Sequence, residues 1–330
     1  MAKEIELKLR LAPEDTGVLA QWLDAHCSAQ GESPLNNEYY DTPDLLLQRN
    51  RAALRVRQTP DGYEQTLKTR GRSVAGVHIR GEWNWPVSGP GLDLSLLTSG
   101  EVADSLPEGS DIEGLQPVFG THFRRRRWLW DSNGCRVEVV IDQGEVRAGG
   151  ASQPLCETEL ELLAGDVSDL WQLLLTMQAQ APLWLSDVSK AERGYRQAGK
   201  TGFWLPPQVR DPDWPEYLSS SLRVIQRASE DSLWGDDPLS LHSLWLAAWP
   251  LAQVLESQQR PLFARLLQPL SPHSRLGTAQ ALTQLSHHVY ELCSSSQDGP
   301  DNWREQVSGA RSTVADVIEC GDDLLKLIRD

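Results

Sequence analysis

The feature that most constrains this chain is the alternation of charged and apolar residues in short segments over roughly its first 162 residues. In the run Glu4-Ile5-Glu6-Leu7-Lys8, every second residue is charged and the residues between are aliphatic. Because successive side chains of a β-strand point to opposite faces, such segments have one ionic and one apolar face. We expect strands at residues 3–10, 36–40, 52–58, 63–69, 76–87, 122–131, 135–142 and 155–163. Eight strands indicate a sheet that closes on itself.

Two segments of this first half have helical periodicity. Residues 13–30 place Leu19, Trp22 and Leu23 on one side of a helix, and residues 166–179 have a similar apolar stripe. We expect both helices to cover an apolar face of the sheet.

The second half of the chain has a different pattern. Glycines and prolines punctuate residues 199–215, and apolar residues then recur every three or four positions at 218–225, 282–292 and 314–328, which indicates a helical bundle. The sequence therefore predicts an α+β protein. Its expected parts are a β domain at 1–202, a linker at 203–215 and a helical domain at 216–330.

The charge balance narrows the possible partners. The chain has 31 basic and 46 acidic residues, a formal net charge of −15, so its overall field holds neither nucleic acid nor anionic membrane. Five cysteines without a CxxC pair argue against a disulfide framework and favour a reducing compartment. The charged N-terminal segment does not read as a signal peptide, and the most apolar stretch, residues 244–255, is too short to span a bilayer. We expect a cytoplasmic protein.

Like charges lie two positions apart on the ionic faces, as at Glu157, Glu159 and Glu161. Such neighbours are about 6.5–7 Å apart, so three carboxylates repel one another unless a cation lies among them. One interpretation is a solvated ionic face above a buried apolar one, which is common for alternating strands. The other is that the ionic faces line an interior. Unpaired charges there are costly, so that interior must hold water, metal or an anion.

The residue types suit a metal-bound chain of phosphates. Carboxylate oxygens are preferred ligands of Mg²⁺ and Mn²⁺. Arginine binds phosphate oxygens two at a time, and lysine acts as a point charge. An ionic face that combines glutamates from two strands with about nine cations could hold both the metal and the polyanion.

Several motifs occur in a recognisable order over residues 1–200. They are Glu4-Ile5-Glu6-Leu7-Lys8, Leu54-Arg55-Val56-Arg57, Thr66-Leu67-Lys68, Arg80-Gly81-Glu82, Arg125 with Arg127, Ile141-Asp142-Gln143-Gly144, Glu157-Thr158-Glu159-Leu160-Glu161 and Ser189-Lys190-Ala191-Glu192-Arg193-Gly194-Tyr195. The first matches the ExExK signature, and the set resembles the CYTH superfamily of triphosphate tunnel metalloenzymes. The resemblance extends to the bacterial inorganic triphosphatases that join a CYTH to a CHAD domain. It implies an eight-stranded antiparallel β tunnel with flanking helices and an inward ionic face.

The resemblance also implies roles for individual residues. Glu4, Glu6 and Glu159 are the expected ligands of Mg²⁺ or Mn²⁺, with Glu157 and Glu161 supporting them or holding a second ion. Together with Lys8, the first three form the expected catalytic set. The implied triphosphate contacts are Lys8, Arg55, Arg57, Lys68, Arg80, Arg125, Arg127, Lys190 and Arg193. Glu82, Glu138 and Asp142 are expected to support the site.

The activity that the resemblance implies is the hydrolysis of inorganic triphosphate to pyrophosphate and phosphate by a metal-activated water. Alternatives on the same fold are a hydrolase of thiamine or nucleoside triphosphates and a class IV adenylate cyclase. A third alternative is a polyphosphate-binding module without turnover.

Other signals carry little weight. Residues 194–201 match the P-loop expression GxxxxGK[ST], but Pro206 and Pro207 prevent the helix that a P-loop requires. His287 and His288 have no HExxH pattern. Residues 203–330 resemble a shortened CHAD domain, a helical module associated with polyphosphate. With 10 basic and 17 acidic residues, a net charge of −7, they lack the basic stripe that polyphosphate binding requires.

Overall fold

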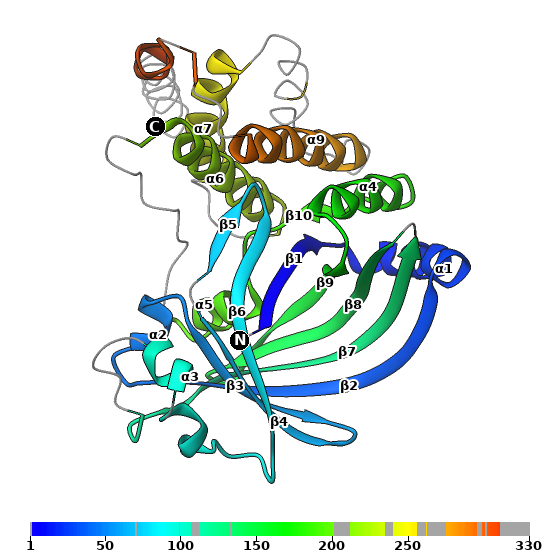
Figure 1. Ribbon diagram of the computed structural model, residues 1–330, viewed down its shortest axis with the longest axis vertical. Coiled ribbons are helices and arrows are strands. Elements are labelled where there is room, and N and C mark those ends of the chain that lie inside the picture. Colours follow the sequence, from blue (N-terminus) through cyan, green and yellow to red (C-terminus); the bar gives the residue numbers. More distant parts are fainter. Residues whose placement is uncertain are drawn as a thin grey trace, which may run out of the picture. The chain divides into compact units, whose positions relative to one another are not determined.

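In the computed structural model, the chain is described at residues 2–69, 71–98, 100–106, 112–132, 134–200, 212–234, 240–255, 262, 275–295, 299–300 and 302–310. It forms two compact units, whose elements are labelled in Figure 1. One unit contains residues 1–73, 77–181 and 188–203, and the other contains residues 74–76, 182–187 and 204–330. Two short segments from the β-rich part of the sequence therefore belong to the second unit.

The first unit is built on a closed antiparallel sheet. Its strands follow one another in the order β1, β9, β8, β7, β2, β3, β4 and β6, and β6 pairs with β1 to complete the circle. The bounds are β1 Ala2–Arg10, β2 Ser28–Asp41, β3 Ala53–Thr59, β4 Gly62–Lys68, β6 Val77–Val87, β7 Gln116–Ser132, β8 Cys135–Ala148 and β9 Ala151–Ala164. These eight strands confirm the predicted tunnel. Two further strands are short, β5 at Arg72–Val74 and β10 at Trp184–Leu185.

The outer face of the closed sheet is apolar and is covered by helices. Leu7 and Leu9 of β1 are fully buried on this face. Helix α1 (Thr16–His26) contacts β2 and β7, and α4 (Val167–Gln178) contacts β9. Around β2, β3 and β4, the outer apolar side chains form a core with α2 (Leu46–Arg49), α3 (Gly100–Ser105) and the 3-10 helix η2 (Leu94–Leu97). Burial of these apolar side chains under the helices stabilises the outer face of the sheet, and the ionic side chains of the same strands therefore point to the inside of the tunnel.

Helix α5 (Lys190–Gln197) packs against the inner face of β7, β8 and β9. Its Tyr195 joins an inner apolar cluster with Leu35, Tyr39, Phe119, Phe123, Val146, Ala148 and Leu155. The approach is close at Gly194, where an added Cβ would lie 2.0 Å from the ring of Phe119. Only glycine therefore allows α5 to reach this depth.

Several element boundaries differ from the sequence-based prediction; for example, β7 begins six residues before the predicted strand 122–131. The helix predicted at 13–30 is a 3-10 turn, η1 (Pro13–Asp15), followed by α1, which ends at His26. Ser28 already pairs with Leu129 in β7, so strand pairing overrides helical propensity there. Strands β8 and β9 are longer than predicted because they form one hairpin, whose turn residues Gly149 and Gly150 have positive φ.

The described part of the second unit is mainly helical. It contains α6 (Trp214–Trp234), α7 (Ser240–Val254) and α9 (Arg275–Ser294), and α6 contacts both of the others. The helical periodicity predicted at 218–225 and 282–292 is thus confirmed. The periodic segment at 314–328 and linker residues 203–211 lie outside the described residues. Among the helices that are described, none has the length and apolarity needed to cross a membrane.

Candidate active site in the tunnel

Strand pairing brings the charges of β1 beside those of β6 and β9. Lys8 lies opposite Glu159, and Glu6 lies opposite Glu161. On the other side of β1, Glu4 lies opposite Arg80. Because facing residues of paired strands share one face of the sheet, all these side chains lie on the inner face.

Two cations hold the carboxylates of the ExExK motif. The Lys68 ammonium donates to Glu4 Oε1 at 2.7 Å, and Arg80 Nε donates to Glu4 Oε2 at 3.1 Å. Arg80 also pairs with Glu6. Burial opposes ionisation of Glu6, but the charges of Lys8 and Arg80 outweigh it and lower its pKa. Glu6 is therefore a carboxylate anion although it is only 2% exposed.

Glu159 joins two parts of this ionic network. Lys8 Nζ lies 2.7 Å from Glu159 Oε1 and 2.9 Å from Glu6 Oε2. Arg125 donates to the other carboxylate oxygen, Glu159 Oε2, at 2.8 Å. The same guanidinium makes a bidentate contact with Asp142, at 2.8 and 2.7 Å. Glu159 thus lies between cations from β1 and β7.

Helix α5 supplies a further cation. Ser189 caps the helix by accepting a hydrogen bond from a backbone N–H of its first turn, where Lys190 also lies. Lys190 Nζ lies 2.7 Å from Asp142 and 3.1 Å from Glu159, and it also pairs with Glu157. One ammonium group therefore contacts three carboxylates.

Asp142, Glu157 and Glu159 form a carboxylate triad that fits a divalent metal. One oxygen from each lies within 4.8 Å of the others. Burial opposes ionisation, but Arg125 and Lys190 outweigh it and lower the pKa of Asp142. The pKa of Glu159 is lowered against burial mainly by Lys190 and Lys8. Both are thus in the ionised form that ligates a hard cation.

A cluster of arginines adjoins this ionic network and is formed by Arg55 and Arg57 of β3 together with Arg125. Burial, and then the charges of Arg55 and Arg125, lower the pKa of Arg57 to about 9. Among the described residues, the Nε of Arg55 has no hydrogen-bond partner. Crowded guanidinium groups with an unused donor are suited to bind an anion.

Comparison with known proteins agrees with this geometry. The family model of the CYTH domain matches residues 2–195. The chain belongs to the CYTH domain family. The matched region contains all of the predicted site residues, whereas the resemblance of residues 203–330 to a CHAD domain stays a prediction.

Individual relatives were also found. The chain is 36% identical over 202 residues to a Haemophilus influenzae protein named inorganic triphosphatase; the match covers 61% of this chain and 56% of that protein. The chain thus spans little more than half the length of this relative. A solved Hippeastrum structure, described as a candidate adenylyl cyclase with a dominant triphosphatase activity, is 22% identical with a TM-score of 0.46, covering 60% of this chain and 97% of its own. A Bacillus halodurans structure, described as a candidate adenylate cyclase, is 20% identical with a TM-score of 0.37, covering 58% and 98%.

Two uncharged residues of the CYTH tunnel were not predicted as site residues. Asn37 accepts from Arg57 Nε at 2.8 Å and donates to Thr121 Oγ1 at 3.0 Å. Tyr39 is buried, and the charge and hydrogen bond of Arg55 outweigh the effect of burial and lower its pKa. The sequence spacing could have identified them. Asn37 and Tyr39 are two positions apart in β2, so they share one face of the strand, and they lie opposite the two arginines of β3.

The remaining acidic residues of the prediction lie on the same inner face. Glu138 lies opposite Glu161 in the β8–β9 pairing and is half-buried. Burial, and then the charges of Glu4 and Glu6, raise the pKa of Glu161 to about 7. Glu82 lies 3.5 Å from Lys68. The assignment of Glu4, Glu6 and Glu161 as metal ligands stays a prediction.

Two of the predicted basic residues, Arg193 and Arg127, make fewer ion pairs with the tunnel carboxylates than Lys190 does. Arg193 of α5 is buried, with its Nε 3.7 Å from Glu157. Arg127 belongs to the inner face by its register opposite Val140, but it is exposed. In the described part of the chain, no carboxylate forms an ion pair with Arg127. Its role as a triphosphate contact stays a prediction.

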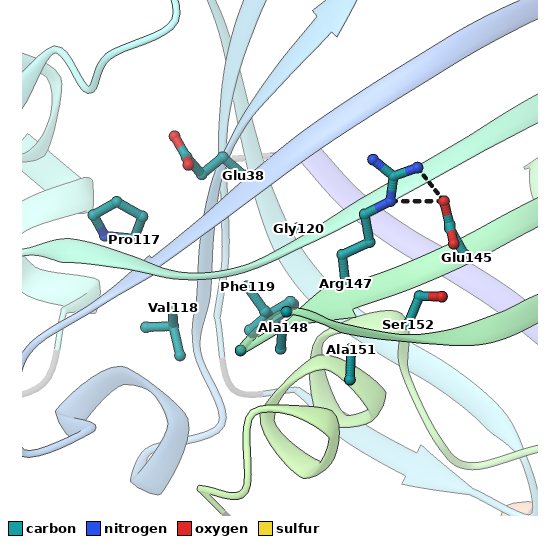
Figure 2. Close-up of a pocket in the computed structure, with 12 residues that line it drawn as sticks. Glu38, Pro117, Val118, Phe119, Gly120, Glu145, Arg147, Ala148, Ala151 and Ser152 are labelled. Carbon is teal, nitrogen blue, oxygen red and sulfur yellow. Dashed lines mark hydrogen bonds and ion pairs between the residues drawn. The ribbon is translucent and has the colours of Figure 1, made fainter.

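A separate hollow of about 590 Å³ lies beside the β8–β9 hairpin (Figure 2). Its lining includes Glu38 and Ser152 and the side chains of Glu145 and Arg147, which pair with each other. None of the predicted site residues lines it.

Proposed function

We propose that the chain hydrolyses inorganic triphosphate to pyrophosphate and orthophosphate in a reaction that requires Mg²⁺ or Mn²⁺. The observation that carries the proposal is that Arg125 belongs both to the arginine cluster and to the surroundings of the carboxylate triad. A site for anionic phosphates thus adjoins a site for a divalent cation. The Haemophilus influenzae relative supports this choice of substrate.

We assign the arginine cluster to the binding of phosphate oxygens. Arg55, Arg57 and Arg125 present planar donors that match such oxygens two at a time. Lys8, Lys68, Arg80, Lys190 and Arg193 surround the carboxylates and can shift their contacts towards the anionic substrate. Arg127 would contact the substrate from its exposed position.

The carboxylates would hold the metal. We assign Asp142, Glu157 and Glu159 to one ion, with Glu4, Glu6 and Glu161 as further ligands. A bound divalent ion would polarise a phosphoryl oxygen and lower the pKa of a coordinated water. Glu82 and Glu138 would support this set through charge alone.

The chain's own residues supply positioning and charge in the reaction. The oxygen of a water forms a bond to the terminal phosphorus, and the bond from that phosphorus to the bridging oxygen breaks. The electron pair leaves with the bridging oxygen as pyrophosphate, and a tunnel carboxylate accepts the proton of the water. Arg55 and Arg57 neutralise the charge on the transferred group.

A phosphate-release assay tests the proposal. It compares tripolyphosphate, ATP, thiamine triphosphate and long-chain polyphosphate, each with Mg²⁺, with Mn²⁺ and with a chelator. We expect release from tripolyphosphate to be the fastest and to stop with the chelator. Faster turnover of ATP or thiamine triphosphate would overturn the choice of substrate, and tight binding of polyphosphate without release would overturn hydrolysis.

We also propose that residues 1–202 are the catalytic domain and residues 216–330 a helical domain with a structural or regulatory role. The family match over residues 2–195 supports the first part. The net negative charge of residues 203–330 disfavours binding of the polyanion polyphosphate, which supports the second part.

A further inference from the structure

The segment of residues 182–187 connects α4 to α5, yet it belongs to the helical unit. It contains the short strand β10, and its last residue is Asp187. Three positions later the chain reaches Lys190, which contacts the carboxylate triad of the tunnel. The segment is therefore a part of the helical unit that the chain links directly to a residue of the proposed active site.

Helix α6 holds Asp187 with two arginines one helical turn apart. Arg227 Nε donates to the Asp187 carboxylate at 3.0 Å, and its terminal nitrogen donates to the Asp187 backbone oxygen at 3.3 Å. Arg223 Nε lies 3.5 Å from the same carboxylate. Arg227 and Asp187 are both buried, so their ion pair has little screening by water.

Neighbouring residues of the segment are held by the same helix. Trp184 Nε1 donates to Ser229 Oγ at 3.1 Å, and Ser186 Oγ donates to the carboxylate of Glu230. All four side chains are buried. Because a buried polar group that loses its partner is costly, these contacts fix the path of the chain up to Asp187.

Little slack separates Asp187 from Lys190. Three residues can span at most about 10 Å, and the two in between are themselves fixed. Val188 is buried, and Ser189 caps α5. A displacement of Asp187 would therefore be transmitted to the first turn of α5.

We propose that Arg227 is a positioning residue, which acts through Asp187 to hold Lys190 against the carboxylate triad. This inference rests on the proposed function, since it assigns to the helical unit a task in the same reaction. Misplacement of a catalytic-site group by about 1 Å can lower a rate by about 10²-fold. The helical unit would thus be required for full activity.

A double-mutant cycle tests the path from Arg227 to Lys190. We expect Arg227→Met and Lys190→Met each to lower kcat/KM for tripolyphosphate by 10-fold or more. We expect the double variant to be no slower than the slower single variant, because both changes act through the position of Lys190. Effects that multiply, or an Arg227→Met variant with wild-type kinetics, would overturn the proposal.

Chemical labelling of lysines gives a readout that does not depend on activity. Lys190 and Lys8 are both buried in the tunnel, but only Lys190 belongs to α5. We expect Arg227→Met to raise the rate of Lys190 acetylation by acetic anhydride several-fold, measured by peptide mass spectrometry, and to leave Lys8 unchanged. An unchanged Lys190 rate, or an equal rise at both lysines, would contradict positioning.

Two further variants complete the test. Ser286→Ala removes a buried hydrogen bond from Gln226 in the same helical unit and leaves the contacts of Asp187 with Arg227 and Arg223 in place, so Lys190 labelling and kcat/KM should match wild type. If Arg227→Met does not fold, Asp187→Asn removes the same ion pair with a side chain of equal shape, and the same results are expected. A wild-type protein that is inactive on tripolyphosphate would refute the proposed function, whereas the labelling result would still decide whether Arg227 holds Lys190.

Discussion

The tunnel and the helical unit both bury charged side chains, but they neutralise them in different ways. In the helical unit, Asp187 is paired with Arg227 and Arg223, so opposite charges are matched. In the tunnel, Arg57 lies beside Arg55 and Arg125, and burial together with these like charges lowers its pKa to about 9. The Asp187 charge is thus paired within its unit, whereas the tunnel combines paired charges with a group of three crowded arginines.

This difference separates a structural from a functional use of buried charge. A matched pair needs no further partner. Crowded like charges destabilise the fold until an oppositely charged ligand arrives, and such perturbed groups are typical of functional sites. In the tunnel, the crowding of Arg55, Arg57 and Arg125 leaves positive charge in excess beside a paired ionic network, which suits an anionic ligand.

The largest effect is expected from Glu159→Gln. This change removes the anion that Lys8, Arg125 and Lys190 share, and it removes one carboxylate of the triad. We expect kcat for tripolyphosphate to fall by roughly 10³-fold, measured by phosphate release with Mg²⁺. The matched control is Glu32→Gln, which removes the partner of Arg124 on the exposed side of the protein and should leave kcat unchanged. Equal activity of the two variants would remove Glu159 from the reaction.

Arg57→Met should weaken binding and stabilise the fold. Removing one of three crowded cations should raise KM for tripolyphosphate by about 10-fold, because one bidentate phosphate contact is lost. The folded-state pKa of Arg57 is lowered, so its charge costs stability at neutral pH. That cost falls as pH rises from about 9 towards the ordinary value of 12.5, where the unfolded chain binds more protons.

We therefore expect Arg57→Met to unfold at a higher temperature than wild type at pH 7, by calorimetry. The exposed Arg124→Met serves as the control and should change neither KM nor the melting temperature. A lower melting temperature for Arg57→Met would show that the arginine charges are already neutralised by partners in the protein, as the charge of Asp187 is in the helical unit.

Gly194→Ala should destabilise the tunnel unit. The added Cβ would overlap the ring of Phe119, so α5 must shift, at a cost of about 1–3 kcal/mol. Chemical denaturation measures this loss. The matched control is Gly277→Ala in α9, where an added Cβ meets no atom within 4 Å, and which should gain up to about 1 kcal/mol. Similar changes in both variants would contradict the close approach of α5.

The smallest effect is expected from Glu161→Gln. The folded-state pKa of Glu161 is raised from 4.5 to about 7. Between these values the unfolded chain loses the proton first, so stability falls as pH rises through this window. The variant should lack this part of the loss, so its melting temperature relative to wild type should rise from pH 4.5 to pH 7.5 in metal-free buffer. A difference that stays constant with pH would place Glu161 in bulk solvent.

Much of the tunnel could be predicted because period-2 alternation has one physical meaning. Glu6 and Leu7 must lie on opposite faces of β1, and the same rule applied to each strand led to the closed sheet. The pairing of Lys8 with Glu159 follows only after strand order is known, which the sequence alone does not contain. The roles carried by the ExExK motif came from a resemblance rather than from periodicity.

Other parts could not be predicted for identifiable reasons. Residues 28–30 contain no β-branched or aromatic side chain and continue a helical pattern, and only their pairing with β7 makes them a strand. Asn37 and Tyr39 are uncharged, so a prediction based on ionic faces does not include them.

Helix α5 contains a glycine and mostly polar residues, which do not predict a helix inside the tunnel. Its close approach to the inner face of the sheet depends on the absence of a side chain at Gly194.

The pairing of β1 with both β6 and β9 has a consequence for how the protein forms. Strand β1 is made first, but its neighbour in β9 is more than 140 positions later in the chain. Contacts so distant in sequence form slowly, after the intervening strands are in place. The Lys8–Glu159 ion pair of the ExExK motif therefore forms only when the circle closes, so the tunnel site is completed late in folding.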